Sequence, residues 1–142
     1  MAKYKDEFFR DRHARTSYAA ETILGILQPA LPALQSAVDI GCGVGTWLSV
    51  LQRRDVPEVR GVDGHWVDVG NLVIPADSFS HHDLQADLDL GRRFDLAISL
   101  EVAERAYDPA VRGQAIGGLL RTPPPLDLTH MALPRVTVGE RL

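Results

Sequence analysis

The chain has 142 residues and a formal net charge of -4, a length that fits one domain with a buried core. Its acidic balance indicates no general attraction to nucleic acid or to an anionic membrane, and no apolar run approaches the length of a membrane span. The single cysteine excludes an internal disulfide and the charged N-terminal segment lacks the apolar core of a signal peptide, which together predict a cytoplasmic protein.

The first expected element is a helix over residues 17–34. Its apolar side chains recur at helical spacing, and Ser17 is suited to cap its start. Pro29 and Pro32 are expected to end or break it, because proline cannot continue a helix without losing a hydrogen bond.

Four strands and a second helix are expected next along the chain. The apolar run at 37–40 stops at a glycine, as a buried parallel strand does, and 46–54 has one apolar face of helical period. Further strands are expected at 59–62, at 78–82 and at 94–100, where apolar residues alternate. Strands that alternate with helices indicate an α/β domain with a parallel sheet.

The composition changes near residue 121. A helix is expected to begin at Asp108-Pro109, because proline suits the first helical turn. From 121 onward the chain has four prolines and no periodicity, and only 135–138 resembles a strand. The expected organisation is therefore one domain over 1–120 and an irregular tail over 121–142.

Three glycines stand at alternate positions between the first strand and the second helix. In a parallel α/β sheet such a turn lies at the carboxyl end of the strands, where ligands bind. Gly41, Gly43 and Gly45 remove the Cβ atoms that would obstruct a ligand, and they tolerate positive φ. The helix that follows offers free N–H groups and a positive dipole end, which favour a carboxylate or a phosphate.

The spacing of these glycines separates two kinds of nucleotide site. A dinucleotide fingerprint requires glycine at the first, third and sixth positions, but Thr46 takes the sixth, which disfavours a nicotinamide-dependent oxidoreductase. With Asp39 in front, the pattern D-x-G-x-G-x-G resembles motif I of the class I S-adenosylmethionine-dependent methyltransferases. The resemblance implies a Rossmann-like, doubly wound, mostly parallel sheet and S-adenosyl-L-methionine as the cofactor.

Two further acidic positions fit the same reading. Asp63 follows the second strand about 20 positions beyond the glycines, where a carboxylate would accept the ribose hydroxyls, and Gly64 would leave room for the sugar. The resemblance implies that Asp83 accepts the adenine amino group while Leu84 packs on the ring. Asp87 and Asp89 are competing candidates for the same role.

The remaining site assignments also come from the resemblance. Asp39 and the glycine segment, with Cys42 packed near the cofactor, would place the methionine end, and Glu101 would reach the crevice from the fourth strand. Relatives carry a histidine where Arg105 stands, and no catalytic base is identified here. Adjacent His81 and His82 would point to opposite faces of a strand, so no metal site is expected.

The length conflicts with a complete member of this family. The family has a seven-stranded sheet, whereas four strands are expected up to residue 100 and 42 residues remain. We therefore expect a truncated sheet of about four to five strands. Two hypotheses follow: a methyltransferase with a small-molecule acceptor, or a truncated, non-catalytic or partner-dependent protein that binds S-adenosylmethionine. A second copy or a partner subunit could complete the sheet.

Overall fold

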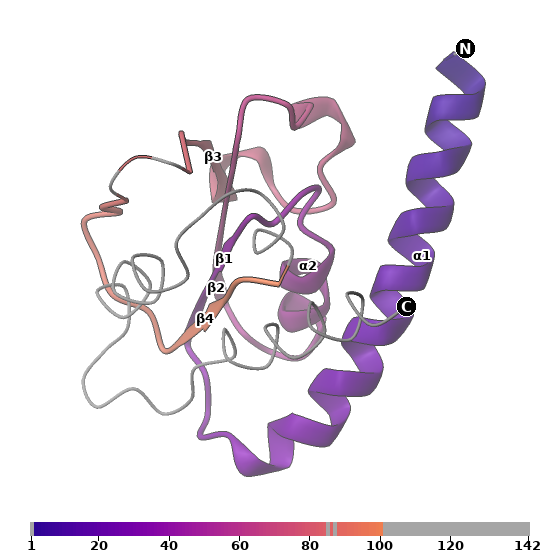
Figure 1. Cartoon of the computed structure of the whole chain (residues 1–142). Coiled ribbons are helices and arrows are strands. Elements are labelled where there is room, and N and C mark those ends of the chain that lie inside the picture. Colours follow the sequence, from indigo (N-terminus) through magenta and orange to yellow (C-terminus); the bar gives the residue numbers. More distant parts are fainter. Residues whose placement is uncertain (1, 85, 87, 101–142) are drawn as a thin grey trace, which may run out of the picture.

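A computed structural model describes residues 2–84, 86 and 88–100 of the chain (Figure 1). The helices and strands in chain order are α1 (Ala2–Leu27), β1 (Ser36–Ile40), α2 (Thr46–Arg53), β2 (Glu58–Asp63), β3 (Phe79–His81) and β4 (Leu96–Ile98). Short 3-10 turns lie at Gln28–Ala30 (η1), Val69–Asn71 (η2) and Ala76–Ser78 (η3). The helix expected from Asp108, the strand expected at 135–138 and the boundary at 121 lie outside the described residues.

The strands form one parallel sheet in the order β3-β2-β1-β4. The chain moves outward from β1 through β2 to β3, then returns to place β4 on the other side of β1. Asp39 of β1 lies beside Gly61 of β2 and Ile98 of β4. The strand order therefore reverses next to β1, which is where open α/β sheets bind their ligands. This topology confirms the predicted α/β fold with a parallel sheet.

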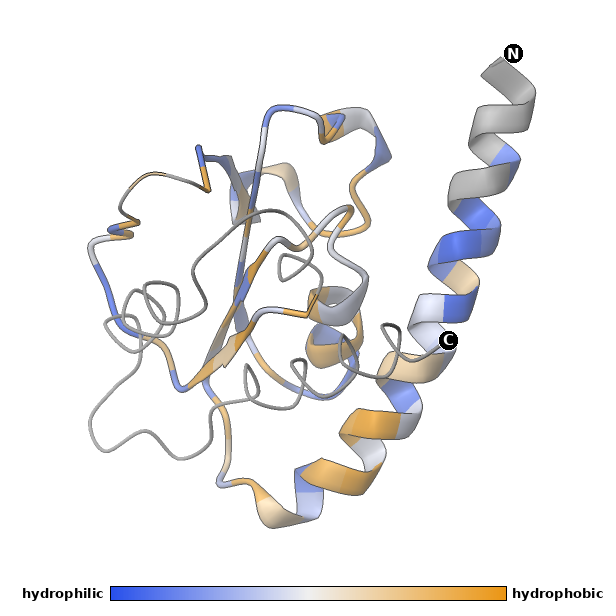
Figure 2. Cartoon of the chain, in the orientation of Figure 1, coloured by the Kyte–Doolittle hydropathy of each residue, from blue (hydrophilic) through white to orange (hydrophobic). Residues whose placement is uncertain are grey.

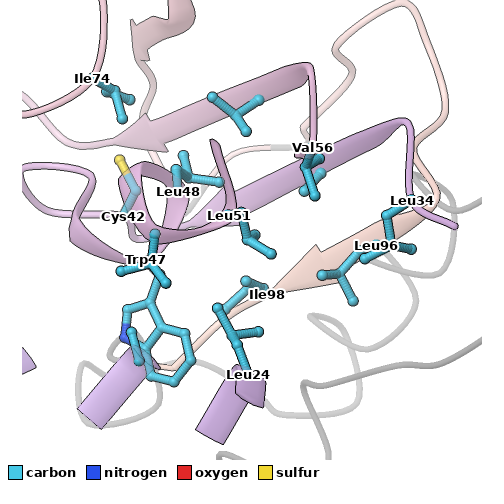
Figure 3. Packing of buried hydrophobic residues seen from close by; sticks show 14 of the residues in the cluster. Leu24, Leu34, Cys42, Trp47, Leu48, Leu51, Val56, Ile74, Leu96 and Ile98 are labelled. Atoms are coloured by element: carbon cyan, nitrogen blue, oxygen red, sulfur yellow. The ribbon is translucent and has the colours of Figure 1, made fainter. Parts of the chain in front are cut away.

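One face of the sheet is covered by both helices. Figure 1 shows α1 and α2 on the same side of the strands, and Figure 3 shows Leu24 of α1, Leu51 of α2 and Ile98 of β4 around a common interior. All three side chains are at most 2% exposed. Burial of a leucine or isoleucine side chain contributes about 1.5–3 kcal/mol, so this interior is the main source of stability for the described part of the chain.

The other face of the sheet has a second apolar cluster. It contains Val38, Ile40, Val62, Phe94 and Ala97, with the partly buried Leu84, Leu88 and Leu90 packed against it. Because successive side chains of a strand point to opposite faces, β1 and β4 contribute to both clusters. This explains why their sequences are continuously apolar rather than alternating between apolar and polar.

The first helix corrects one prediction. It begins at Ala2, not at Ser17, and it ends at Leu27 where η1 takes over around Pro29. The residues before 17 include many helix formers but no apolar stripe, so hydrophobic periodicity could not detect them. Figure 2 shows this change of character along α1, from hydrophilic residues in the middle to hydrophobic residues near its C-terminal end. Ser17 lies inside the helix, where its Oγ accepts a hydrogen bond from Arg53 at 3.2 Å instead of capping.

The fourth strand is shorter than the predicted 94–100. The Asp95 carboxylate accepts hydrogen bonds from the backbone N–H groups of Gln35, at 2.9 Å, and Ser36, at 3.1 Å. This side chain therefore occupies donors at the start of β1, and the regular strand begins at Leu96. Phe94 remains buried, with the Arg92 guanidinium 4.5 Å from the centre of its ring.

A polar network joins α1 to the end of α2. Arg54 donates from Nε to Gln28 Oε1 at 2.7 Å and from Nη1 to Glu21 Oε2 at 2.9 Å, while Arg53 reaches Glu21 Oε1 at 3.2 Å. The Arg54 side chain is 26% exposed and that of Glu21 39%, so water weakens these ion pairs. Their geometry nevertheless fixes where α1 lies along α2.

Replacement of Arg54 with methionine is expected to lower the free energy of unfolding by about 1 kcal/mol. The variant keeps the apolar stem but loses an ion pair and a hydrogen bond at a partly screened site. Arg15→Met is the matched control, because Arg15 forms its ion pair with Asp11 on the exposed surface of α1. Urea unfolding of both variants measures the difference, and equal stabilities would show that the network does not hold α1.

Among the described residues, no helix combines the length and the apolar character needed to cross a membrane.

Candidate functional site

The segment 41–45 between β1 and α2, called the glycine loop below, is built on left-handed backbone. The φ angles of Gly41, Gly43 and Gly45 are 81°, 57° and 90°. An L-residue with a side chain adopts this region at a cost of about 1–2 kcal/mol, so glycine suits all three positions. A Cβ at Gly45 would also lie 2.8 Å from Cγ1 of Ile74, whereas a Cβ at Gly43 would meet no atom within 4 Å.

The glycine loop is held against the end of β2. The Gly41 N–H donates to the Val62 carbonyl at 2.7 Å, and the Val73 N–H donates to the Val44 carbonyl at 2.9 Å. Gly43 donates its N–H to Asp63 Oδ2 at 2.7 Å. The loop therefore has a fixed path over the carboxyl ends of the two central strands.

Asp63 is the buried carboxylate at the end of β2 and is 5% exposed. Its Oδ2 accepts from Gly43, and its Oδ1 accepts from the N–H of Gly64 at 2.7 Å. Two ionised oxygens offer about four acceptor positions, so these bonds orient the carboxylate and leave acceptor capacity for ligand hydroxyls. The structure thus brings the predicted ribose acceptor into direct contact with the predicted glycine loop.

A second buried carboxylate, Asp39, lies in β1 before the loop and is 3% exposed. The pKa of the Cys42 thiol is affected by its burial and by the charges of Asp39 and Asp63. Burial raises the pKa of its thiol well above the ordinary value, and the negative charges of Asp39 and Asp63 raise that pKa further. The beginning of the glycine loop is therefore a region of negative potential, which favours a cationic group.

The side chain of Cys42 belongs to the core. It is 8% exposed and lies close to Leu48 and Ile74 (Figure 3), and a Cβ at Gly61 would approach its Sγ to 2.7 Å. The thiol is therefore protonated, enclosed and unsuited to act as a nucleophile. A contact between Cys42 and the cofactor, through its backbone or its sulfur, stays a prediction.

Cys42 is expected to resist iodoacetamide in the folded protein and to react once the chain unfolds. Because the pKa is raised in the native state, the unfolded state releases the thiol proton first, above about pH 8.5. The thiol's contribution to stability is therefore present below that pH and is lost progressively as the pH rises, an effect that Cys42→Ala removes. Mass spectrometry after alkylation, and unfolding curves across alkaline pH, measure both effects. Rapid labelling under native conditions would contradict the buried, protonated thiol.

The first turn of α2 contributes backbone donors. Its N-cap, Gly45, supplies no side-chain cap, and its carbonyl accepts from the Ser49 N–H at 2.9 Å. The N–H groups at the start of a helix lack intrahelical partners and favour an anionic group. Thr46, the first residue of α2, is buried, and its Oγ1 lies 2.9 Å from Nδ1 of His13 in α1.

The predicted adenine contacts follow β3. His81 pairs with Asp63 across the β2–β3 ladder, and the His82 N–H donates to the Asp63 carbonyl at 2.9 Å. Asp83, the next residue, is exposed, and Leu84 packs on the second core cluster. Asp83 and Leu84 therefore follow directly after residues that are bonded to Asp63. Their contact with adenine stays a prediction.

Asp89 is one of the alternatives to Asp83 for the adenine contact. Its Oδ1 accepts a hydrogen bond from the Gly91 N–H at 2.8 Å, so it stabilises its own turn. Asp87 and Glu101 lie outside the described residues.

Gly64 was expected to leave room for the ribose of the cofactor. In the structure the Trp66 ring fills this space, and a Cβ at Gly64 would overlap that ring. Trp66 itself is 62% exposed. The neighbouring His65 and His81 rings stack on each other with their centres 5.2 Å apart, and His81 Nε2 lies 2.9 Å from the Val67 carbonyl oxygen.

Within the described residues, no group of three His, Cys, Asp or Glu is arranged to hold a metal ion.

Comparisons with known proteins point to one family. A family described as a methyltransferase domain matches residues 8–122. None of the curated proteins matches the chain. Several solved structures match the chain. It spans only about half of their length, 49 to 52% in the three cases given next.

These structures include the sugar N-methyltransferase KedS8 from Streptoalloteichus sp. ATCC 53650, with 27% identity over 82% of this chain and 49% of that chain and a TM-score of 0.63. The plantazolicin methyltransferase BpumL, solved with a pentazolic desmethylPZN analog and SAH, has 20% identity over 84% and 49% and a TM-score of 0.62. DesVI of Streptomyces venezuelae has 19% identity over 84% and 52% and a TM-score of 0.59. At 20% and 19% identity, the similarity to BpumL and DesVI shows a shared fold and nothing further.

Proposed function

Because the chain belongs to the methyltransferase domain family, we propose that it binds S-adenosylmethionine at the glycine loop and transfers the methyl group to a small-molecule acceptor. S-adenosylmethionine is the cofactor of this family. The observation that carries the proposal is the contact between Asp63 and Gly43, because it joins the two predicted cofactor-binding motifs in one site.

The residues present fit the chemical parts of the cofactor. Ribose hydroxyls are hydrogen-bond donors, and the buried Asp63 carboxylate retains acceptor positions for them. The sulfonium and the amino group are cationic, and the negative potential of Asp39 and Asp63 favours both. The uncapped start of α2 favours the methionine carboxylate.

The chain's part in the reaction is to bind and orient. When bound, S-adenosylmethionine supplies an activated methyl group, and the protein must hold it in line with the acceptor nucleophile. The glycine loop and Asp39 would fix the methionine end, Asp63, oriented by the Gly64 N–H, the ribose, and Asp83 with Leu84 the adenine. The carboxyl edge of β4 would face the acceptor.

A small molecule is the acceptor class that we propose. The net charge of -4 gives no electrostatic reason to favour nucleic acid. KedS8, whose name describes it as a sugar N-methyltransferase, is the most similar in sequence of the three structures compared. Cytoplasmic placement is part of this proposal and rests on the single cysteine, which fits a reducing compartment.

One observation favours a second function. The chain spans about half the length of the solved structures it matches. A chain of this kind could bind S-adenosylmethionine without catalysing transfer, or catalyse it only when a second copy or another subunit completes the sheet.

Two measurements test these functions. Calorimetric titration with S-adenosylmethionine should give saturable binding, whereas NAD should give none. Transfer of a labelled methyl group to a panel of amino sugars and other small nucleophiles then separates an enzyme from a cofactor-binding protein. Absence of binding at millimolar S-adenosylmethionine would contradict both functions, and binding without any transfer would favour the second.

A further inference from the structure

We infer that His13 is a positioning residue of the cofactor site, holding the start of α2 in place through Thr46. This inference rests on the proposed binding of S-adenosylmethionine at the glycine loop. Its structural basis is the hydrogen bond of 2.9 Å between His13 Nδ1 and Thr46 Oγ1, which joins residues 33 apart in the chain.

The helical repeat explains why His13 reaches this point. His13, Ser17, Ala20 and Leu24 are spaced by four, three and four residues, so they share one face of α1. Ala20 and Leu24 are buried at 0% and 1% exposure. Since Ser17 contacts Arg53 at the end of α2, the same face carries His13 to the beginning of that helix.

Thr46 is well placed to transmit the contact. It is 5% exposed and follows Gly45 directly. Its carbonyl accepts the Ser49 hydroxyl at 2.7 Å, so Thr46 is bonded both to α1 and within the first turn of α2. Movement of its side chain would therefore shift the N–H groups that the first turn offers to a ligand.

The glycine loop then has anchors on two sides. Asp63 of β2 holds it at Gly43, and His13 of α1 holds the residue that immediately follows it. The first anchor comes from the sheet and the second from a helix that is itself fixed by Glu21 and Arg54. Docking of α1 is in this way coupled to the geometry of the loop.

The affinity test uses paired substitutions. His13→Ala and Thr46→Val should each weaken S-adenosylmethionine binding about 5- to 10-fold, consistent with one hydrogen bond. The double variant should be no weaker than the single ones, because both remove the same contact. His13→Asn should restore affinity to within about 2-fold, since its amide can occupy the place of Nδ1, and Thr46→Ser should do the same. Arg15→Ala, on the exposed side of α1, is the control and should bind as the natural chain does.

A second readout needs no cofactor. Amide hydrogen exchange at Gly43 to Thr46 should accelerate in His13→Ala and return to normal in His13→Asn, while β2 stays protected. Natural affinity in His13→Ala, or equal losses in the alanine and asparagine variants, would overturn the positioning role alone. Failure of the natural chain to bind would instead contradict the proposed function and this inference together, and the exchange experiment would show whether the anchor itself exists.

Discussion

Replacement of Asp63 with alanine is expected to weaken S-adenosylmethionine binding by at least about 100-fold. The change removes the acceptor for the ribose hydroxyls, and a hydrogen bond to a charged group contributes about 1.5–3 kcal/mol. It also leaves the N–H groups of Gly43 and Gly64 without their carboxylate partner, which loosens the glycine loop. Isothermal titration with S-adenosylmethionine measures the loss.

Two variants show whether the loss is specific to this carboxylate. Asp77→Ala removes an exposed acid from η3 at the same formal charge change and should leave affinity within about 2-fold. Asp63→Asn keeps the shape but sets an amide NH2 against a backbone N–H, so its affinity should fall nearly as far as that of Asp63→Ala. If Asp63→Ala binds normally, the ribose does not lie on this residue.

Gly45→Ala is expected to destabilise the folded protein by about 2–5 kcal/mol. Two costs add: the left-handed backbone at φ 90° costs about 1–2 kcal/mol, and a Cβ 2.8 Å from Ile74 Cγ1 overpacks a buried contact at about 1–3 kcal/mol. Ile74 is 4% exposed, so it has little freedom to move aside. Denaturant unfolding monitored by circular dichroism gives the free-energy change.

Gly43→Ala is the matched control for this prediction. Its φ of 57° carries the same kind of backbone cost, but its Cβ would meet nothing within 4 Å. It should therefore lose only about 1–2 kcal/mol. Equal destabilisation by the two alanines would mean that the contact with Ile74 does not constrain the loop. When the double variant Gly45→Ala/Ile74→Ala is compared with Ile74→Ala alone, the added glycine substitution should cost only the backbone share.

The parts of the fold that depend on local pattern could be predicted from the sequence. The run at 37–40 is apolar and stops at a glycine, and it is β1; the one-sided pattern at 46–54 is α2. The beginning of α1 could not be predicted, because its first half makes no apolar face and its helical state follows from residue propensity. Pro29 marked the end of that helix correctly within a few residues.

The candidate site was predictable where a motif fixes it. The spacing of the glycines and the position of Asp63 after a strand identified two motifs, and parallel pairing brings the ends of those strands together. The partners from other elements gave no such signal. Ile74 lies between the strands expected at 59–62 and 78–82, where no element is predicted, and only the folded chain shows that it limits Gly45.

His13 was missed for a related reason. Its spacing from Ser17, Ala20 and Leu24 is visible in the sequence, but the helix was expected to begin after it. A helix that begins one turn earlier carries His13 on the same face as these residues, and a polar residue that continues an apolar stripe is the signal for such a contact.

The central claim is that S-adenosylmethionine binds across the glycine loop with its ribose on Asp63. A crystal structure of this chain with S-adenosylhomocysteine tests it most directly. The account predicts ribose hydroxyls about 2.6–3.2 Å from the Asp63 carboxylate oxygens and the methionine portion over residues 41–45. A ligand bound elsewhere, with Asp63 still contacting only Gly43 and Gly64, would contradict it.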